Sequence, residues 1–356
     1  MPQTPILQFE QVSKRFGATV AVDDVSLAIA PGEFFALLGP SGCGKTTLMR
    51  MAAGFERPDA GRIGIDGVDA ADQPPHKRPV NMMFQSYALF PHMSVFDNIA
   101  FGLKAAGFSR AVIAARVSEM ARLAQLQGLE KRKPHQLSGG QKQRTALARA
   151  LARGTKLLLL DEPLGALDRK LREETQFELM DIQKRLGAAF VVVTHDQDEA
   201  MSMADRIAVM RAGKIEQIGS PVEIYERPRT RYVAEFIGEI NIFEGGVSRA
   251  DDVLRLDTRE GVVEAIAPAT IGDGATIAIA VRPERMRLAP AGEQGGNRLA
   301  GVVHDFAYRG DHRVFRIRLN SGALARVAVP AAQPALRPGE AVTVAFDAAD
   351  CVALDA

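Results

Sequence analysis

Residues 39–47 combine glycines, a lysine and threonines at the spacing of a phosphate-binding loop. They read Gly39-Pro40-Ser41-Gly42-Cys43-Gly44-Lys45-Thr46-Thr47 and fit the pattern G-x-x-x-x-G-K-[ST]. The glycines allow a curled backbone whose N–H groups point at one anion. In this pattern the lysine reaches the β- and γ-phosphates, and the first threonine hydroxyl ligates Mg²⁺. A plain glycine-rich turn explains neither the lysine nor the threonine, so the stretch predicts a nucleoside triphosphate site.

Other polar residues follow directly after apolar runs that are typical of buried strands. Gln85 follows one run, Asp161 and Glu162 follow a second, and His195 comes after a third. With the run before the glycines, these strands are predicted over residues 34–38, 80–84, 157–160 and 190–193. In an open parallel α/β sheet, ligands bind beyond the carboxyl ends of the strands. We therefore expect all these groups to meet the phosphate-binding loop at one edge of a sheet.

Each of these side chains suits one task in nucleotide hydrolysis. Asp161 is placed to hold Mg²⁺, usually through water, and Glu162 is placed to polarise an attacking water. His195 would sense the γ-phosphate, although a lone histidine near a strand end is usually structural. With residues 39–47 they supply a cradle, a metal site, a general base and a phosphate sensor.

The sequence Leu-Ser-Gly-Gly-Gln at residues 137–141 precedes a stretch with helical character, residues 142–153. Ser138 and Gln141 stand three residues apart, which is the spacing of a capping box. Gly139 and Gly140 lower helix stability, and they make sense where the backbone must approach an anion at the helix start. On local chemistry alone, a helix cap and a ligand contact stay equally open.

Three other features keep two interpretations each. Phe16, after Lys14 and Arg15, would stack on a purine ring if exposed and would otherwise be an ordinary core residue. Asp168 either has a functional role or simply caps the helix predicted over residues 169–186. The mixed aromatic and polar loop at residues 86–98 is either a docking surface or a plain connection.

Composition and charge indicate which kinds of partner and cellular compartment suit the chain. The 356 residues carry 44 basic and 43 acidic side chains, a net charge of +1, which gives no support to a nucleic-acid-binding surface. Cys43 and Cys351 lie far apart in the sequence and suggest a reducing compartment. The first residues lack the basic and apolar regions of a signal peptide, and no segment approaches the roughly 20 apolar residues that span a bilayer.

The sequence pattern changes near residue 240. Before it, strands alternate with helices, including an amphipathic helix predicted over residues 109–127, as in an α/β fold. After it, short alternating apolar runs between turns predict an all-β barrel or sandwich. We therefore predict two domains, residues 1–238 and residues 239–356, the second without catalytic residues.

The complete set of motifs, in this order, resembles the ATP-binding cassette (ABC) ATPases. Residues 137–141 match the family signature, and its other motifs match residues 39–47, Gln85, Asp161 with Glu162, Asp168 and His195. The resemblance covers residues 6 to about 238 and implies a P-loop NTPase core with a helical subdomain at about residues 86–156. Residues 239–356 resemble the OB-like TOBE domain of importer ATPases of the sugar, polyamine and iron branch.

The resemblance implies a role for each matching residue. ATP would lie on residues 39–47 of one protomer and on Ser138, Gly139, Gly140 and Gln141 of the other, with Phe16 stacked on the adenine. The family mostly has tyrosine at the position of Phe16, and a ring face remains here. Mg²⁺ would be held by Thr46, Gln85 and Asp161, while Glu162, His195 and Gln85 would be catalytic. Asp168 would communicate across the dimer, and residues 86–98 would dock on membrane subunits.

Within that branch, residues 81–93, 131–135, 236–245 and 302–311 resemble the polyamine importers. The resemblance implies an ATP-hydrolysing subunit that drives uptake of a polyamine such as putrescine. Its partners would be a second copy of this chain, two transmembrane permease subunits and a periplasmic or extracellular solute-binding protein, without nucleic acid. It would lie peripherally on the cytoplasmic face of the inner membrane.

The alternatives are of three kinds. The first is the same role for another substrate, such as a sugar, iron, sulfate or phosphonate. The second is a non-transport ABC protein of DNA repair or translation, for which no coiled-coil insertion, second cassette or basic patch is visible. The third is an inactive binding module, which the intact Lys45, Asp161 and Glu162 disfavour.

Overall fold

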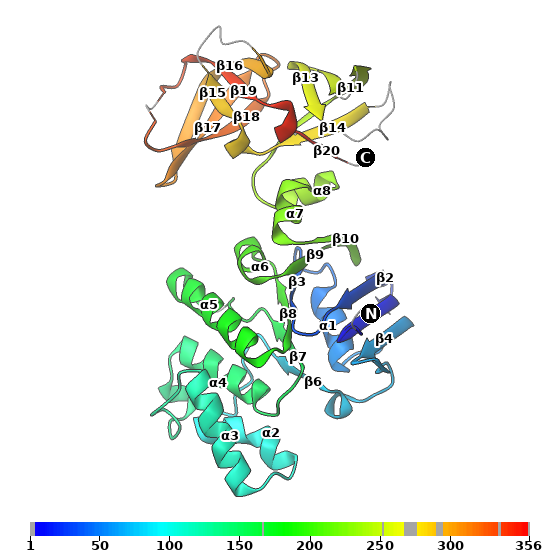
Figure 1. Ribbon diagram of the computed structural model, residues 1–356, viewed down its shortest axis with the longest axis vertical. Helices are drawn as coiled ribbons and strands as arrows, with labels where there is room; N and C mark the ends of the chain where they lie inside the picture. Colours follow the sequence, from blue (N-terminus) through cyan, green and yellow to red (C-terminus); the bar gives the residue numbers. More distant parts are fainter. Residues whose placement is uncertain are drawn as a thin grey trace. The chain divides into compact units, whose positions relative to one another are not determined.

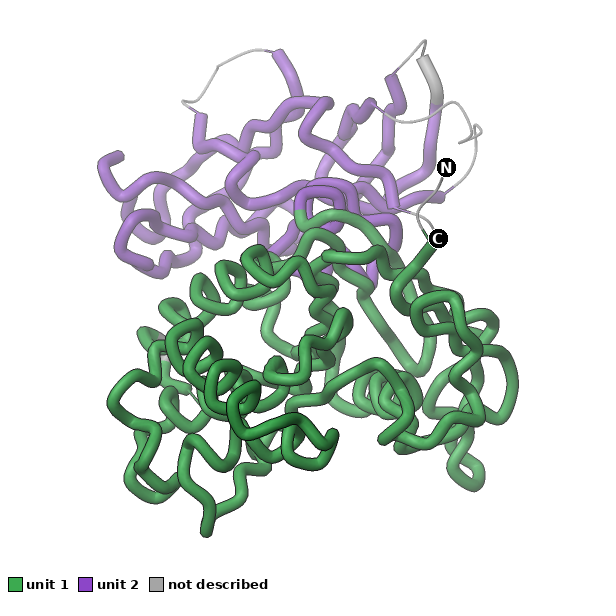
Figure 2. Tube along the Cα trace, turned by 60° about the horizontal axis from the view of Figure 1, so that its bottom comes forward, with its two compact units in different colours: residues 1–221 green, residues 222–356 purple. Residues whose placement is uncertain are grey.

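The computed structural model describes residues 4–165, 167–250, 253–266, 276–289, 295–333 and 336–354. The chain is divided into two compact units, Met1–Pro221 and Val222–Ala356, which Figure 2 colours separately. The first unit mixes helices and strands, and the second is built mainly from strands (Figure 1).

A six-stranded sheet forms the centre of the first unit, in the order β10-β9-β3-β8-β7-β6. Neighbouring strands from β9 to β6 pair in parallel, and β10 is an antiparallel edge strand. The strands are β3 (Phe34–Leu38), β6 (Val80–Met83), β7 (Leu157–Asp161), β8 (Ala189–Thr194), β9 (Arg206–Arg211) and β10 (Lys214–Gly219). Every residue of β3 and β8 is buried, as expected for parallel strands covered on both faces.

The pairing register brings the carboxyl ends of these strands together. Leu38 of β3 pairs with Thr194 of β8, so these two strands end level. β7 ends one residue short of β8, at Asp161, and β6 ends one residue short of β7, at Met83. The residues that follow these strands therefore share one edge of the sheet.

A second, antiparallel sheet of the first unit has the order β2-β1-β4-β5. Its strands are β1 (Leu7–Phe16), β2 (Thr19–Ile29), β4 (Ala60–Ile65) and β5 (Val68–Asp69). One hydrophobic core joins side chains of this sheet, such as Ile29, with Leu37 of the parallel sheet and Leu48 of helix α1 (Lys45–Ala53). Because α1 shares this core with both sheets, its first residue is held firmly at the end of β3.

Three helices lie between β6 and β7: α2 (Val95–Ala105), α3 (Arg110–Leu123) and α4 (Gly139–Leu151). Their caps, Ser94, Ser109 and Ser138, each accept a hydrogen bond from a backbone N–H three residues on. We expected α3 to reach residue 127, but it ends at Leu123 because Gln125 adopts a left-handed conformation with φ 52°.

The remaining helices of the first unit are α5 (Arg169–Leu186), α6 (Gln197–Met203) and the 3₁₀ helices η1 (Pro75–Lys77) and η2 (Pro134–Gln136). Gly187 ends α5 in the left-handed conformation, as the sequence predicted. Within the described parts of the chain, no helix has the length and apolar character needed to cross a bilayer.

The second unit contains two antiparallel sheets, β13-β12-β11-β14-β20 and β15-β19-β16-β17-β18. The first consists of β11 (Asn241–Ala250), β12 (Val253–Thr258), β13 (Gly261–Ile266), β14 (Thr276–Val281) and β20 (Val352–Leu354). The second consists of β15 (Arg287–Ala289), β16 (Asn297–Tyr308), β17 (His312–Leu319), β18 (Leu324–Pro330) and β19 (Ala341–Phe346), and the 3₁₀ helices are η3 (Pro283–Arg285) and η4 (Ala348–Asp350). A core shared by both sheets includes Phe243, Ile279, Phe315 and Val344, so this part is all-β in its packing, as predicted.

Two short helices, α7 (Pro221–Glu226) and α8 (Arg231–Phe236), lead into the second unit. The compact units divide between Pro221 and Val222, and the domain boundary at residue 238 stays a prediction. The guanidinium of Arg282 donates to the carbonyl oxygens of Tyr225 at 2.8 Å and of Ile237 at 2.5 Å. These hydrogen bonds attach α7 and α8 to the β structure.

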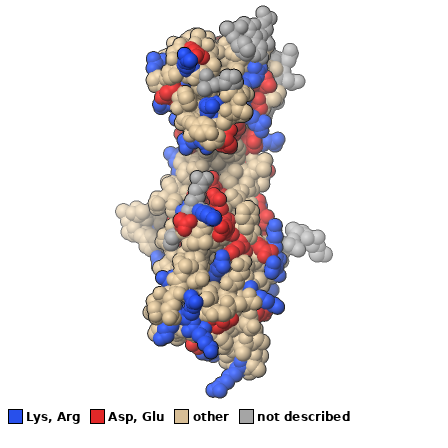
Figure 3. Space-filling view, turned by 90° about the vertical axis from the view of Figure 1, so that its left-hand side faces the viewer, with Lys and Arg blue, Asp and Glu red and all other residues tan. Residues whose placement is uncertain are grey.

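Acidic and basic side chains are interspersed over the face of the molecule in Figure 3. This distribution agrees with the balanced formal charge of the sequence.

Candidate active site

The phosphate-binding loop connects β3 to α1 and requires glycine at two positions of its backbone. Gly42 and Gly44 have φ values of 81° and 104°, in the region where residues with a side chain are strained. A Cβ atom added to Gly44 would lie 2.2 Å from the carbonyl oxygen of Ala21, so only glycine fits there. Helix α1 begins directly after Gly44, and the N–H groups of its first turn have no partners within the helix. Such a helix start favours an anion.

Lys45 folds back over this loop and is only 6% exposed. Its Nζ donates to the carbonyl oxygens of Gly39 at 2.7 Å and of Pro40 at 2.9 Å, and lies 3.7 Å from Cys43 Sγ. The hydrogen-bond partners of this buried ammonium are neutral, so its charge is available to an anion and the loop fits a polyphosphate.

Thr46 and Asp161 meet at the edge of the sheet, where Thr46 Oγ1 donates to Asp161 Oδ1 at 3.3 Å. Burial raises the pKa of Asp161, the hydrogen bond from Thr46 opposes this rise, and the neighbouring charge of Glu162 adds to it. A partly buried carboxylate beside a hydroxyl is a hard oxygen donor set that suits Mg²⁺. Within the described residues, no three His, Cys, Asp or Glu side chains gather to hold a metal. One carboxylate completed by phosphate and water is the usual arrangement for magnesium.

Glu162 is held on both carboxylate oxygens by residues that follow other strands. Gln85 Nε2 donates to Oε2 at 2.7 Å, and His195 Nδ1 lies 3.1 Å from Oε1. The backbone of Glu162 is left-handed, with φ 44°, and strain of this kind, about 1–3 kcal/mol, concentrates at functional sites. Three residues predicted to converge are thus in direct contact, in a position that suits a general base beside the metal donors.

Residues 138–141 and Asp168 lie at the starts of helices. Ser138 Oγ accepts from the N–H of Gln141 at 3.3 Å, and Gln141 Oε1 accepts from the N–H of Ser138 at 3.0 Å, so the capping box is present. Asp168 Oδ1 accepts from the N–H of Leu171 at 3.1 Å and caps α5. Among the described residues, no hydrogen bond or ion pair joins either segment to residues 39–47. Their predicted ligand contacts stay predictions.

Phe16 is 47% exposed, which excludes the core interpretation. Lys14 Nζ lies 5.3 Å from the centroid of its ring. An exposed ring at the end of β1 is available for stacking, and stacking on adenine stays a prediction.

Sequence reasoning missed two arginines that support these segments. Arg149 of α4 donates to the carbonyl oxygens of Tyr87 and Ala88, just after Gln85. Arg172 of α5 forms an ion pair with Asp196, next to His195. Ala88, Tyr87 and Asp196 are 61, 62 and 24 residues away from their arginines, respectively. No local spacing signals such contacts, although each arginine lies on a predicted helix.

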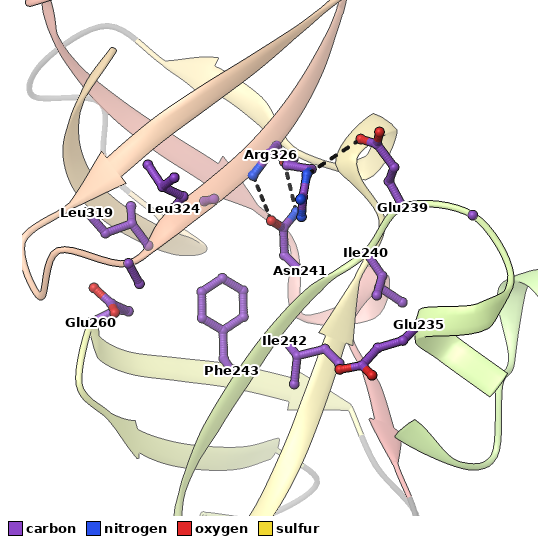
Figure 4. Close-up of a pocket in the computed structure, with 13 residues that line it drawn as sticks. Glu235, Glu239, Ile240, Asn241, Ile242, Phe243, Glu260, Leu319, Leu324 and Arg326 are labelled. Atoms are coloured by element: carbon purple, nitrogen blue, oxygen red, sulfur yellow. Dashed lines mark hydrogen bonds and ion pairs between the residues drawn. The ribbon is translucent and has the colours of Figure 1, made fainter. Parts of the chain in front are cut away.

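A cavity of about 480 Å³ lies in the second unit, and none of these motifs lines it (Figure 4). Its polar side chains already have partners. Asn241 exchanges hydrogen bonds with the backbone of Arg326 at 2.7 and 2.8 Å, Glu239 lies 3.8 Å from Arg326 Nε, and Glu260 accepts from Ser321. The cavity therefore offers little to recruit a polar ligand.

A parallel sheet that carries a glycine-rich phosphate loop after β3 and an acidic pair at the end of β7, with β8 between them, defines a P-loop nucleoside triphosphatase. The chain belongs to the ABC transporter family, whose family model matches residues 22–165. A second family model, the TOBE domain, matches residues 279–354. The predicted fold class and the ATPase class are thereby confirmed.

Curated relatives resemble the chain over most of its length. The putrescine transport ATP-binding protein PotG of Escherichia coli (strain K12) is 55% identical over 90% of this chain and 86% of its own. The spermidine/putrescine import ATP-binding proteins PotA of Rubrobacter xylanophilus and Pseudomonas aeruginosa are 49% and 48% identical, each over 98% of this chain and over 93% and 99% of their own.

Solved structures resemble about 60% of the chain. The dimeric ATP-binding cassette MJ0796, in a post-hydrolysis state bound to ADP and Pi, is 30% identical with a TM-score of 0.54, covering 60% of this chain and 98% of its own. The protein cbiO1 of Clostridium perfringens, part of the ABC transporter complex cbiONQ, is 31% identical with a TM-score of 0.59, covering 62% and 91%.

Proposed function

We propose that this chain is the ATP-hydrolysing subunit of an importer that takes up a polyamine such as putrescine. The observation that carries the catalytic part is the position of Glu162 between Gln85 and His195, beside the Thr46–Asp161 pair. The polyamine substrate is supported by the names of relatives that are 48–55% identical over nearly the whole chain.

In this proposal ATP lies along residues 39–47, and the ammonium of Lys45 exchanges its carbonyl partners for β- and γ-phosphate oxygens. Thr46, Asp161 and Gln85 would hold Mg²⁺, which would neutralise the phosphate charge. Glu162 orients and deprotonates the attacking water, and His195 contacts the γ-phosphate. Residues 138–141 and Asp168 lie at the starts of α4 and α5. In this proposal they contact the nucleotide of a second copy of the chain.

The full assembly contains two copies of this chain, two transmembrane permease subunits and a solute-binding protein outside the membrane. Residues 86–98 form the surface on which the permeases dock. The chain then acts as a peripheral subunit at the cytoplasmic face of the membrane.

The variant Glu162→Gln tests the proposal. Because the amide keeps the hydrogen bonds but cannot accept a proton, ATP hydrolysis should fall by roughly 10²–10⁴-fold while ATP still binds. The exposed Glu174 on α5 supplies the matched control, and Glu174→Gln should hydrolyse ATP normally. Unchanged turnover in Glu162→Gln would remove Glu162 from the role of base.

The transported substrate is tested in cells that lack this chain and in the same cells supplied with the wild-type chain or a variant. Cells lacking this chain should lose uptake of labelled putrescine or spermidine and keep uptake of labelled maltose. The wild-type chain and Glu174→Gln should restore polyamine uptake, and Glu162→Gln should not. Loss of maltose uptake with intact polyamine uptake contradicts the polyamine assignment and leaves the ATPase assignment standing.

A further inference from the structure

Arg172, on the first turns of α5, connects two segments that flank the site. Its Nη1 lies 2.6 Å from Asp196 Oδ2, and its Nη2 donates to the carbonyl oxygen of Leu167 at 3.3 Å. Asp196 follows His195, and Leu167 precedes Asp168. One guanidinium therefore contacts two segments. One lies next to His195, the predicted phosphate sensor, and the other lies next to Asp168, the predicted dimer contact.

The His195 loop is fixed on both sides by this network. Asp196 caps α6 and donates its own N–H to Thr194 Oγ1 at 3.0 Å. Thr194 Oγ1 in turn donates at 2.7 Å to Glu199, whose side chain is 3% exposed. His195 lies between these two anchored neighbours, and its ring contacts Glu162.

Arg172 forms ion pairs with two carboxylates, Asp196 and Glu199, so one positive charge faces two acidic side chains. Arg172 Nε is buried and has no hydrogen-bond partner among the residues that the structure describes. It lies 3.7 Å from Glu199 Oε1, which is too long for a hydrogen bond. A small approach of α5 to α6 would complete this bond. The contact between the two helices is therefore incomplete in this conformation.

We propose that Arg172 is a positioning residue for ATP hydrolysis, which ties the His195 loop to the Leu167–Asp168 segment so that the two move together. The proposal rests on the function proposed above. When a second protomer contacts Asp168, the displacement passes through the guanidinium to Asp196 and sets the position of His195 against Glu162. Only the rigid fork of arginine reaches the Leu167 carbonyl and the Asp196 carboxylate at once.

The test compares Arg172→Met and Arg172→Lys with Arg185→Met. Arg185 lies on the same helix in an exposed ion pair with Asp181 at 2.9 Å, so it is the matched control. We expect Arg172→Met to lower kcat about 10–100-fold, since a displacement of about 1 Å at a reacting group costs on this order. Affinity for a fluorescent ATP analogue should stay within about twofold, because residues 39–47 are untouched. Arg172→Lys should restore part of kcat, and Arg185→Met should match the wild type.

A double-variant cycle makes the outcome decisive. Asp196→Asn keeps a good helix cap but removes the charge that Arg172 contacts. The proposal expects Asp196→Asn to lower kcat, and Arg172→Met added to it to cause little further loss. Independent, multiplicative losses overturn the proposal, as does a kcat for Arg172→Met within about twofold of the wild type. If Arg172→Met does not fold, Arg172→Lys takes its place in the cycle.

Failure of this proposal is distinguishable from failure of the proposed function. A wild-type chain that does not hydrolyse ATP contradicts the proposed function itself. A wild-type chain that hydrolyses ATP, together with a fully active Arg172→Met, contradicts only the role of Arg172.

Discussion

At the scale of single residues, Asp161 illustrates how the site trades stability for function. Its burial raises its pKa above the ordinary value, so the folded chain holds this proton more tightly than the unfolded chain. The stability that the carboxyl contributes is therefore fully present below its unfolded pKa and is lost as pH rises through the folded pKa. Above the folded pKa the ionised group costs stability, and a bound cation would offset that cost.

This argument predicts the behaviour of Asp161→Asn. Without nucleotide and magnesium, its thermal midpoint should exceed that of the wild type, with a gain that grows as pH rises through the folded pKa. Its magnesium-dependent ATP hydrolysis should fall at least about tenfold, since the proposed metal ligand is lost. Scanning calorimetry at several pH values measures the first effect, with Asp72→Asn, at a side chain 93% exposed, as control. A midpoint below that of the wild type contradicts the argument.

Some residues of the site could be predicted from the sequence and others could not. Gln85, Asp161, Glu162 and His195 were found because each comes just after an apolar strand, and parallel strands end at one edge. Arg172 and Glu199 carry no such signal. Their contacts join side chains on different helices, and such pairs are fixed only when the helices pack.

At the scale of elements, α4 is attached to the segment that follows β6. Arg149 donates to the carbonyl oxygens of Ala88 at 2.7 Å and Tyr87 at 2.8 Å, and lies 5.5 Å from the centre of the Phe90 ring. Tyr87 and Ala88 both have positive φ, at 61° and 43°. The helix that begins at Ser138 therefore holds a strained turn two residues beyond Gln85.

We predict that Arg149→Met releases this turn. Two carbonyl oxygens lose their donor, which should cost about 1–3 kcal/mol of stability, and Gln85 should lose its fixed approach to Glu162. Urea unfolding and ATP turnover measure the two effects. Arg122→Met, at an exposed position on α3, should change neither. Full turnover in a destabilised Arg149→Met would separate the turn from catalysis.

Element boundaries were predictable where a residue type alone decides them. Gly187 ends α5 because glycine accepts the left-handed conformation, and the sequence predicted this end. The end of α3 was predicted at Gly128 but lies at Leu123, because Gln125 adopts that conformation and Leu126 N–H donates back to the carbonyl of Ala121 at 2.7 Å. Glutamine carries no sign of this in a sequence.

At the scale of the whole molecule, a single buried arginine connects the first helices of the second unit to its β structure. Arg282 is 4% exposed and donates to the backbone carbonyls of Tyr225, Ile237 and Glu239, with its guanidinium 4.0 Å from the Tyr225 ring. Burial lowers the pKa of Arg282, and burial together with Glu284 raises the pKa of Tyr225 to about 12. The boundary prediction at residue 238 rests on a change in the sequence pattern, whereas a hydrogen bond between residues 45 positions apart leaves no sign in that pattern.

We predict that Arg282→Met detaches α7 and α8 from the β structure. Several buried carbonyl oxygens would lose their donor, at a cost of about 3 kcal/mol in total. Amide hydrogen exchange should then speed up in residues 222–237 while the β11–β14 core stays protected. Arg255→Met, at a side chain 54% exposed and paired with Glu264, is the control. Unchanged exchange in residues 222–237 would show that other contacts hold these helices.

The inward fold of Lys45 has a consequence for how nucleotide arrives. Its bonds to the carbonyl oxygens of Gly39 and Pro40 fix the curve of residues 39–45, so we expect phosphate oxygens to replace these partners on a backbone that is already shaped. Little chain entropy is then left to lose on binding. Backbone amides of this loop should accordingly resist solvent exchange in the apo protein almost as well as in the complex.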